Sequence, residues 1–511
     1  MIGRTISGAL LGVEGYCVNI EVQIGFGASN FFTVGLAEGA VRESKVRVRS
    51  AFVESDLYFP NTCVTLNLAP ADVRKDGSAY DLPIAIAILA ANGEFRNDDL
   101  LRTCMIMGEL GLTGEIRPIR GVLPLVLAAK KAGLTSVMLA PENAAEAALV
   151  EGMTIYCPAN LRQCWNCLRS NQELPRYIAG ERLASEPIVS RDMSDVSGQE
   201  IPKRALEIAA SGGHNLIFIG PPGSGKTMLA QRLPTILPQM AFDEALEVTA
   251  LYSVSGNLGQ RTLIAQRPFR SPHHSISDVG LVGGGSPVPK PGEISLSHHG
   301  VLFLDELPEF KRAVLEVLRQ PLEDGMVNIT RRLQSVQFPA QFMLVASMNA
   351  CPCGNLGSKR KPCVCRPETI EHYQSKISGP LLDRIDIQLE VNEVSYEEIH
   401  HPITAPENSQ QIRARVEACR QVQTDRFRGT PIRCNAQMGV PEIRKYCELT
   451  NEGHALMQRI IDKMGMSARA HHRILKVART IADMDRSQQI STSHLAEAIG
   501  YRILDKRLVR N

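Results

Sequence analysis

The chain of 511 residues is too long for a single hydrophobic core, so two or three domains are expected. Hydrophobic residues make up 44% of it and charged residues 22%, which is ordinary for a soluble globular protein. The 56 Lys and Arg residues balance 54 Asp and Glu residues, which excludes a polyelectrolyte. Any nucleic-acid partner must therefore be attracted by basic groups that are gathered locally.

Secreted and membrane-spanning classes do not fit the sequence. The N-terminal segment has neither a long apolar core nor an obvious cleavage site, and no stretch approaches the roughly 20 apolar residues of a spanning helix. The 13 cysteines are odd in number and scattered except for one tight group, which argues against a disulfide framework. We therefore expect a cytoplasmic protein without a membrane partner.

Four regions follow one another along the chain. Residues 1–170 alternate Val/Ile-rich segments such as CVTLNLAP with Ala/Leu-rich ones such as DLPIAIAILAANG, which predicts a mixed α/β domain. Residues 171–197 are polar, contain two prolines and predict a linker. Residues 198–393 consist of strand–loop–helix units, and residues 394–511 show helical periodicity, as in ARVEACRQVQ and HRILKVARTIADM.

A glycine-rich loop follows a short apolar strand in HNLIFIGPPGSGKTMLAQRL and precedes a helical pattern. This strand–loop–helix context is that of a phosphate-binding loop, in which glycines let backbone N–H groups converge on an anion at the start of a helix. Lys226 would reach the β- and γ-phosphates of ATP, and the Thr227 hydroxyl would bind Mg²⁺. The predicted ATP-binding residues are Gly220, Pro221, Pro222, Gly223, Ser224, Gly225, Lys226 and Thr227.

Two adjacent acids end the apolar strand of GVLFLDELPEF, about eighty residues further along the chain. An acid at the carboxyl end of a neighbouring strand lies beside the bound phosphates. We expect Asp305 to hold Mg²⁺, directly or through water, and Glu306 to orient and activate the attacking water. Without the loop, the same pattern would indicate only a strand that enters a surface turn.

The segments GPPGSGKT, LFLDE, FMLVASMNA and ISGPLLDRIDI, in that order, resemble the AAA+ ATPases, and RPFRSPHHSISDVGLVGGG makes the resemblance to the ComM/YifB family of magnesium-chelatase-like proteins close. The resemblance extends almost end to end. It implies an α/β fold in which an AAA+ P-loop core with a parallel sheet carries a helical C-terminal lid. It also implies a homo-hexamer.

The same resemblance assigns three further site residues. Asn349 matches the sensor-1 residue near the γ-phosphate, Arg384 matches the arginine finger offered to the adjacent subunit, and Arg469 matches the sensor-2 arginine of the lid. A fixed guanidinium can stabilise the charge that spreads over the γ-phosphoryl oxygens. The alternative for each arginine is a surface salt bridge, and Arg473 lies one helical turn from Arg469.

A cysteine group follows the sensor strand directly. Two C-x-C pairs, separated by glycines and basic residues, can direct four thiolates toward one point, and Zn²⁺ is their natural occupant. Because four protein ligands leave no open position, the site would be structural. Redox-active or free thiols are the alternative. The predicted zinc ligands are Cys351, Cys353, Cys363 and Cys365.

Two segments of the first region, VRKDGSAYDLPIAIAI and GELGLTGEIRPIRGVLPLVLAAKKAG, resemble the proteolytic domain of Lon. That family needs a serine nucleophile and a lysine base. The matching positions are Ala79 and Leu123, and the neighbouring Ser78 would point elsewhere and still lack a base. We therefore expect no peptidase activity and interpret this region as an assembly or substrate-docking platform.

Two insertions interrupt the strand motifs. One covers residues 267–297, and the other, GMVNITRRLQSVQFP, predicts a β-hairpin with Arg331 and Arg332 at its tip. In a ring, such tips would form a positive collar able to follow a DNA backbone, whereas the alternative is an exposed hairpin with solvated arginines. For the His273–His274 and His298–His299 pairs, loop-shaping roles are favoured over metal binding.

These observations, together with what the family resemblance implies, predict an ATP-driven, hexameric DNA translocase or helicase. We expect it to act on single-stranded or branched DNA and to promote branch migration in homologous recombination during natural transformation. Its cofactors would be ATP and Mg²⁺, with a structural Zn²⁺. The alternatives are a chelatase-type motor or a protein unfoldase that remodels a protein partner. The response of ATP hydrolysis to DNA or to unfolded protein would separate these three classes.

Overall fold

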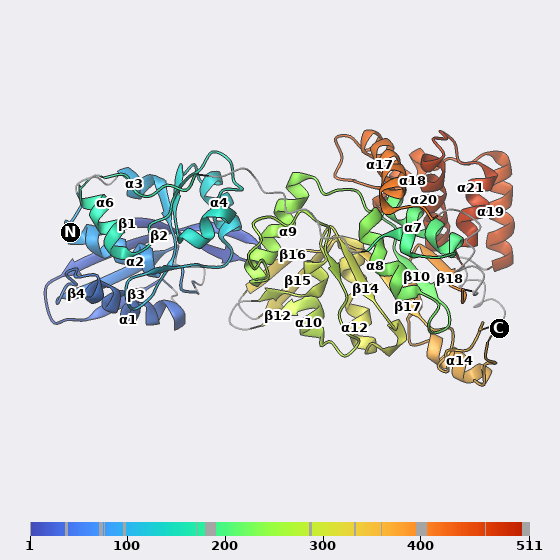
Figure 1. Cartoon of the computed structure of the whole chain (residues 1–511), viewed down its shortest axis with the longest axis horizontal. Helices are drawn as coiled ribbons and strands as arrows, with labels where there is room; N and C mark the ends of the chain where they lie inside the picture. The colour runs from blue at the N-terminus through green and yellow to red at the C-terminus, as the bar shows by residue number, and fades with distance from the viewer. Residues whose placement is uncertain are drawn as a thin grey trace.

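The computed structural model describes residues 2–35, 39–70, 75, 77–95, 99–170, 172–178, 191–285, 289–331, 334–358, 360–394, 406–464 and 467–502. The molecule is elongated, with the N-terminal α/β domain at one end and the C-terminal helices at the other (Figure 1). A second α/β unit, the core, lies between them and carries the glycine-rich loop.

The N-terminal domain is built on a mixed sheet with strand order β3-β4-β2-β1-β5-β8-β9. Buried and partly buried positions alternate along β4, so one face of the sheet is fully covered and the other is more open to solvent. Its strands are β1 (Ile2–Leu11), β2 (Glu14–Gly25), β3 (Phe31–Val34), β4 (Cys63–Ala69), β5 (Cys104–Ile106), β8 (Ser136–Met138) and β9 (Thr154–Tyr156).

Helix α2 fills the centre of this domain because it is apolar on all sides and packs on β1, β2 and α1. The predicted helix DLPIAIAILAANG and the predicted strand CVTLNLAP are present as α2 and β4. The helices are α1 (Gly39–Glu54), α2 (Asp81–Ala91), α3 (Asp99–Thr103), α4 (Val122–Lys131), α5 (Ala144–Ala147) and α6 (Leu161–Ser170), and a small ribbon joins β6 (Glu109–Leu110) to β7 (Ile116–Arg117).

The core contains a parallel sheet with strand order β11-β14-β17-β10-β18. The central strands are apolar, apart from Ser347, because both faces of the sheet are buried. These strands are β10 (Leu216–Ile219), β11 (Phe269–Arg270), β14 (Val301–Leu304), β17 (Met343–Met348) and β18 (Ile387–Glu390).

Helices and a hairpin surround this sheet. The predicted hairpin is present: β15 (Met326–Arg331) pairs antiparallel with β16 (Gln334–Pro339). The helices are α7 (Glu200–Gly212), α8 (Lys226–Ile236), α9 (Phe242–Ser255), α10 (Asp278–Val282), α11 (Glu293–Leu296), α12 (Arg312–Val317), α13 (Arg319–Asp324), α14 (Pro367–Gln374) and α15 (Gly379–Leu382), and β12 (Gly283–Gly284) pairs with β13 (Lys290–Pro291).

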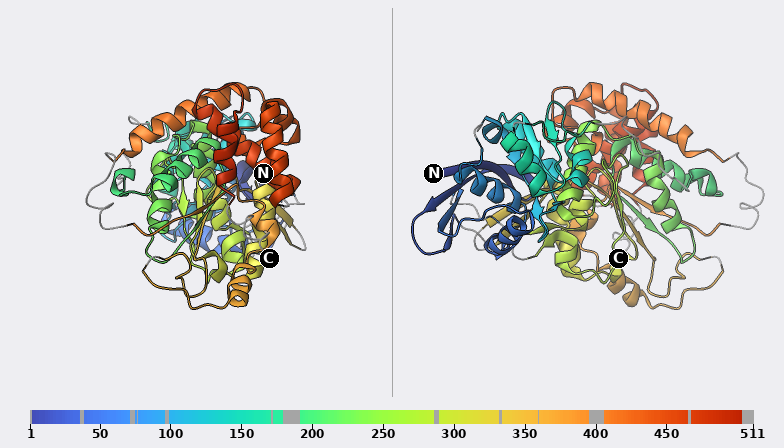
Figure 2. Two further views of the ribbon diagram at one scale, coloured as in Figure 1. Left: turned by 90° about the vertical axis from the view of Figure 1, so that its right-hand side faces the viewer. Right: turned by 60° about the vertical axis from the view of Figure 1, so that its left-hand side comes forward.

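The C-terminal helices lie along the upper side of the core in both views of Figure 2. The predicted helical segments ARVEACRQVQ and HRILKVARTIADM lie in α17 and α20, and both helices pack on α7. Their apolar side chains join one hydrophobic cluster with β10 and β18, so this part is continuous with the core. The helices are α17 (Ser409–Arg426), α18 (Val440–Tyr446), α19 (Asn451–Met464), α20 (Ala468–Met484) and α21 (Thr492–Gly500).

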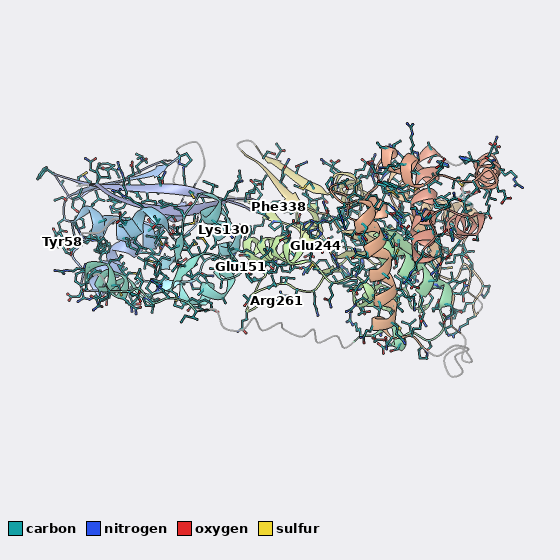
Figure 3. The ribbon with its side chains drawn as sticks, turned by 90° about the horizontal axis from the view of Figure 1, so that it is seen from above. Tyr58, Lys130, Glu151, Glu244, Arg261 and Phe338 are labelled. Atoms are coloured by element: carbon teal, nitrogen blue, oxygen red, sulfur yellow. The ribbon has the colours of Figure 1, made fainter. Side chains whose placement is uncertain are left out.

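The N-terminal domain packs on the core through α4 and α9. Ala250 of α9 belongs to the hydrophobic cluster around α4, and the Ser253 hydroxyl donates a hydrogen bond to the buried Glu146 carboxylate at 2.5 Å. In Figure 3, Lys130 and Glu151 mark the N-terminal side of this junction and Phe338 marks the core side.

The end of the predicted linker packs on the core. The side chain of Met193 is fully buried in the core cluster, and its backbone N–H donates to the Ser409 hydroxyl at 2.8 Å. Asp192 caps the adjacent turn and accepts from Ser194 N. Residues from 192 onward therefore belong structurally to the core, whereas residues 179–190 lie outside the described part.

Candidate nucleotide site

The glycine-rich loop connects the end of β10 to the start of α8. Gly223 and Gly225 have left-handed backbone conformations, with φ of 77° and 91°. A Cβ at either position would meet no atom within 4 Å. These glycines are therefore required by the path of the backbone and leave open space in front of the first turn of α8, where a phosphate would bind.

Lys226 lies over this loop. Its Nζ donates to the carbonyl oxygens of Gly220 and Pro221 at 2.8 Å each and to Asn349 Oδ1 at 3.3 Å. Burial lowers the pKa of Lys226 below its ordinary value, although the charges of Asp305 and Glu306 act in the opposite direction. The ammonium group is thus fixed beside the loop by acceptors that a phosphate can replace.

Asp305 joins three elements at the carboxyl edge of the sheet. Its Oδ2 accepts from the Thr227 hydroxyl at 2.8 Å, and its Oδ1 accepts from the Ser347 hydroxyl. The adjacent hydroxyl and carboxylate oxygens are the kind of ligands that Mg²⁺ takes in phosphate-transferring sites. Thr227 and Asp305 therefore fit the ion predicted for them.

Glu306 has a strained backbone, with φ of 53° in the left-handed region. Its N–H donates to Asp305 Oδ1 at 3.1 Å and to the Ser347 hydroxyl at 3.3 Å. The carboxylate is about half exposed, and its Oε2 lies 3.9 Å from Nδ1 of His274. The side chain is therefore directed away from the core and toward the space where water could approach.

Ser347 and His274 were not identified as site residues from the sequence. Ser347 interrupts the otherwise apolar strand β17, which was a usable signal, because a hydroxyl in a buried strand needs a partner. His274 was interpreted as shaping its loop, and only the folded chain brings it near Glu306.

The two predicted catalytic arginines lie away from this site. The side-chain amide of Asn215 donates a hydrogen bond to the backbone carbonyl of Arg384. Asn215 directly precedes β10, whereas the phosphate loop follows that strand, so the two lie at opposite ends of β10. The four residues of β10 separate the two edges by about 13 Å at roughly 3.3 Å per residue. The structure thus joins Lys226 to Asn349 but does not bring Arg384 to them.

Arg384 and Arg469 both act on the carboxylate of Glu323. Arg384 Nη2 lies 2.6 Å from Oε1 of Glu323, and its hydrogen bond and charge, together with the charge of Arg469, lower the pKa of Glu323. Within one chain Arg384 therefore forms the salt bridge that was its alternative role. Arg473 is bound to Asp386 at 2.9 Å, so the exposed Arg469 is the freer arginine of its helix.

The four cysteines of the predicted zinc site converge. Their sulfur atoms lie within 4.8 Å of one another, and Sγ of Cys351 lies 3.4 Å from Cys353 and 3.6 Å from Cys363. A tetrahedral Zn²⁺ with bonds of about 2.3 Å places its sulfurs about 3.8 Å apart. Backbone N–H groups of Asn355 and Val364 lower the pKa of the Cys353 thiol, which favours the thiolate. The residues fit the ion.

Comparison with known proteins agrees with this geometry. Family models described as "Magnesium chelatase, subunit ChlI", "Subunit ChlI of Mg-chelatase" and "Magnesium chelatase, subunit ChlI C-terminal" match residues 192–399, 20–143 and 406–502. The chain is 43% identical to the competence protein ComM of Haemophilus influenzae and 41% identical to the uncharacterized protein YifB of Escherichia coli. Each match covers 98% of this chain and 97% of the relative.

The chain belongs to the ComM/YifB family of magnesium-chelatase-like AAA+ proteins. Membership in this family implies an ATPase that uses a nucleotide and Mg²⁺, in agreement with the residues gathered around Lys226 and Asp305. A shorter match, 32% identical over 199 residues, relates 35% of the chain to 36% of Lon protease 2 of Bacillus subtilis. The fold class expected from the sequence is confirmed.

The Lon-like domain of this family member has apolar residues at the two matching catalytic positions. Leu123 is fully buried, and its N–H donates to the Glu146 carboxylate at 2.8 Å. The Ala79 carbonyl accepts from Gly108 N at 3.0 Å. Neither side chain supplies a nucleophile or a base, which is consistent with the expected lack of peptidase activity. That lack stays a prediction.

The second histidine pair forms a polar cluster with α9. Nε2 of His298 and of His299 lie 3.0 and 2.8 Å from Oε2 of Glu247. Nδ1 of His298 accepts from Gln341 N at 3.0 Å, so the neutral ring carries its proton on Nε2 and donates to Glu247. Burial lowers the pKa of His298 to about 4. This geometry favours the predicted loop-shaping role over metal binding, which would need a free lone pair on Nε2.

The predicted DNA contacts cannot be placed. Arg332 and the side chain of Arg331 lie outside the described residues, although the flanking strands of the hairpin are present. Among the helices that are described, none combines the length and the apolar composition needed to cross a bilayer.

Proposed function

We propose that this protein is an ATP-driven DNA translocase that works as a ring and promotes branch migration in homologous recombination during natural transformation. The observation that carries the ring is the position of Arg384 and Arg469. Arg384 lies at the sheet edge opposite its own phosphate loop, and Arg469 acts on the same Glu323 carboxylate through its charge, which supports a role of both arginines at a nucleotide held by another subunit. The family relationship to a named competence protein supports the DNA substrate.

The chain's own residues divide the hydrolytic work. Lys226 binds the phosphates, and Thr227 and Asp305 hold the metal ion, which when bound withdraws negative charge from the phosphoryl oxygens. Glu306 orients a water molecule and accepts its proton, and Ser347 fixes the backbone of Glu306. A neighbour's Arg384 must leave Glu323 to stabilise the transition state, which makes hydrolysis dependent on assembly.

The hairpin β15–β16 is the proposed contact with DNA. The middle of its strand β16 lies beside the turn between β1 and β2 of the N-terminal domain, since a Cβ on Gly12 would meet Val336 at 2.7 Å. Arg331 and Arg332 at its tip would supply positive charge to a strand in the pore of the ring.

The test is the response of ATP hydrolysis to DNA. Charge reversal of Arg331 and Arg332 to Glu should abolish stimulation by single-stranded or branched DNA while leaving nucleotide binding within about twofold. Arg428→Glu, at an exposed arginine in the turn that follows α17, is the matched control and should respond as the parent does. An unchanged response of the double variant would contradict the hairpin assignment.

A chelatase-type or unfoldase motor that remodels a protein is the second candidate, because the family models carry the description of a magnesium chelatase subunit. The same assay separates the classes. Stimulation by an unfolded protein and not by DNA would favour this candidate.

A further inference from the structure

A cavity of about 380 Å³ opens beside the phosphate loop, on the side of the segment that leads into α7. Its wall is shared by that segment, the phosphate loop, the cysteine loop (residues 351–365) and the chain that follows β18. The lining residues are Asp195, Val196, Ser197, Gln199, Pro222, Gly223, Ser224, Gly225, Met228, Leu229, Arg360, Glu393 and Val394. Because the cavity continues from the phosphate loop, it is placed to receive the part of a nucleotide beyond its phosphates.

Two polar atoms in this wall lack a hydrogen-bond partner. Oε2 of Glu393 and Oγ of Ser224 are buried and form no hydrogen bond within the described part of the chain. Oε1 of Glu393 accepts a hydrogen bond from the Ser358 hydroxyl at 3.0 Å. This bond fixes the carboxylate and leaves Oε2 without a hydrogen bond. An ionised carboxylate can only accept, so a ligand that satisfies Oε2 would offer a hydroxyl or an amine.

Arg360 lies at the mouth of the same cavity. Its Nε is 3.6 Å from Oε2 of Glu393, beyond hydrogen-bond distance, and its side chain is 72% exposed. Its backbone N–H donates to the Ser358 hydroxyl at 3.1 Å. Ser358 therefore connects Arg360 and Glu393, and the exposed guanidinium, held near Glu393 only by this long ion pair, can move over a planar base.

The cysteine loop is positioned by contact with the phosphate loop. Gly354 has φ of 79°, and a Cβ there would meet the Pro222 ring at 2.8 Å. Leu356 N donates to Cys351 Sγ at 3.3 Å. Ser358 and Arg360 lie between the two cysteine pairs, so an ion bound by the four thiolates would close the loop that carries them.

We propose that the cysteine loop, closed by Zn²⁺, forms one wall of a nucleoside subsite in which Glu393 accepts a hydrogen bond from the nucleoside and Arg360 covers the base. This inference rests on the proposed ATPase function. It assigns the cysteines a role in nucleotide affinity that is separate from the chemistry at Glu306. It also predicts that phosphate binding and nucleoside binding can be separated by mutation.

The first experiment compares ADP with inorganic pyrophosphate by titration calorimetry on the full chain with Mg²⁺. Glu393→Ala and Arg360→Ala should each weaken ADP binding about tenfold or more and leave pyrophosphate binding within about twofold. Lys361→Ala and Glu368→Ala are matched controls, because both side chains are exposed and neither lines the cavity. Unchanged ADP affinity in both cavity variants would overturn the proposal. A parent chain that binds neither ligand would instead contradict the ATPase function.

Two analogues identify the donor that Glu393 binds. If the donor is a ribose hydroxyl, the parent should bind 2′-deoxy-ADP more weakly than ADP, whereas Glu393→Ala should bind the two equally. If the donor is the amino group of adenine, inosine diphosphate should show this difference between the parent and Glu393→Ala instead. Equal affinity of the parent for ADP and both analogues would overturn the role of Glu393.

The second experiment removes the metal. We expect about one Zn²⁺ per chain, and its removal by a chelator should lower ADP affinity about tenfold while pyrophosphate affinity stays within about twofold. Adding Zn²⁺ back should restore ADP binding, which separates a local effect from irreversible unfolding. Absence of zinc from protein purified without chelator, or ADP affinity that does not change when zinc is removed, would overturn the proposed role of the cysteine loop.

Discussion

At the scale of single residues, the site depends on a small network around one carboxylate. Asp305 accepts from Thr227 on one oxygen and from Ser347 on the other, and the Ser347 hydroxyl also accepts from Glu306 N. Ser347 thus connects the acid predicted to hold the metal with the acid predicted to activate water. Its hydroxyl both donates and accepts, which no apolar residue of similar size can do.

Ser347→Ala should therefore lower ATP turnover about tenfold, equivalent to roughly 1.4 kcal/mol, because Glu306 loses a fixed backbone orientation. ADP binding should stay within about twofold, since Ser347 does not line the phosphate loop. Steady-state hydrolysis and calorimetry measure the two quantities. Ser347→Thr, which keeps the hydroxyl, is the matched variant and should retain most of the turnover. Equal rates for Ala and parent would show that Ser347 has no positioning role.

At the scale of elements, the C-terminal helices are held on the core by a buried ion pair as well as by apolar packing. Arg473 of α20 lies 2.9 Å from Asp386, and His214 Nδ1 lies 3.2 Å from the same carboxylate. Burial alone would raise the pKa of Asp386, but the charge of Arg473 and the hydrogen bond from His214 lower it below its ordinary value. Asp386 is therefore charged in the folded state.

Asp386→Asn should destabilise the protein by about 3 kcal/mol, because it leaves Arg473 without its counter-charge. Asp425→Asn, in an exposed ion pair with Arg428, should cost less than about 1 kcal/mol. The pKa of Asp386 is lower in the folded chain than in the unfolded chain, where it is about 4. Its charged form therefore contributes to the free energy of unfolding above about pH 4, and this contribution is lost as the pH falls below that value. Chemical denaturation at pH 7 and below pH 4 measures both effects. If the free energy of unfolding fell equally steeply with acid in the parent and in Asp386→Asn, a charged Asp386 in the folded state would be contradicted.

Elements with strong local patterns could be predicted from the sequence, and contacts between distant elements could not. Helix α2, strand β4 and the hairpin β15–β16 are present where their patterns indicated them. The link between Arg384 and Glu323 was not predictable, because it depends on where α13 lies relative to β18. The nucleoside subsite was missed for the same reason, since Arg360 and Glu393 lie 33 positions apart and meet only through the fold.

At the scale of the whole molecule, the Lon-like domain and the core form one packed body. The buried Glu146 accepts from Leu123 N within its own domain and from Ser253 across the junction. Burial raises the pKa of Glu146, while these two hydrogen bonds act in the opposite direction. The N-terminal domain therefore docks on the core through residues around Leu123, one of the two positions that match the Lon catalytic residues, and its role as an assembly platform stays a prediction.

The whole account depends on ATP hydrolysis at the site built around Lys226, Asp305 and Glu306. The most direct test is steady-state release of phosphate from ATP by the full chain and by Lys226→Ala and Glu306→Gln. We predict that both variants lose at least about 99% of the parent's turnover, and that Glu306→Gln still binds ATP. Turnover of ATP by either variant at the rate of the parent would contradict the account.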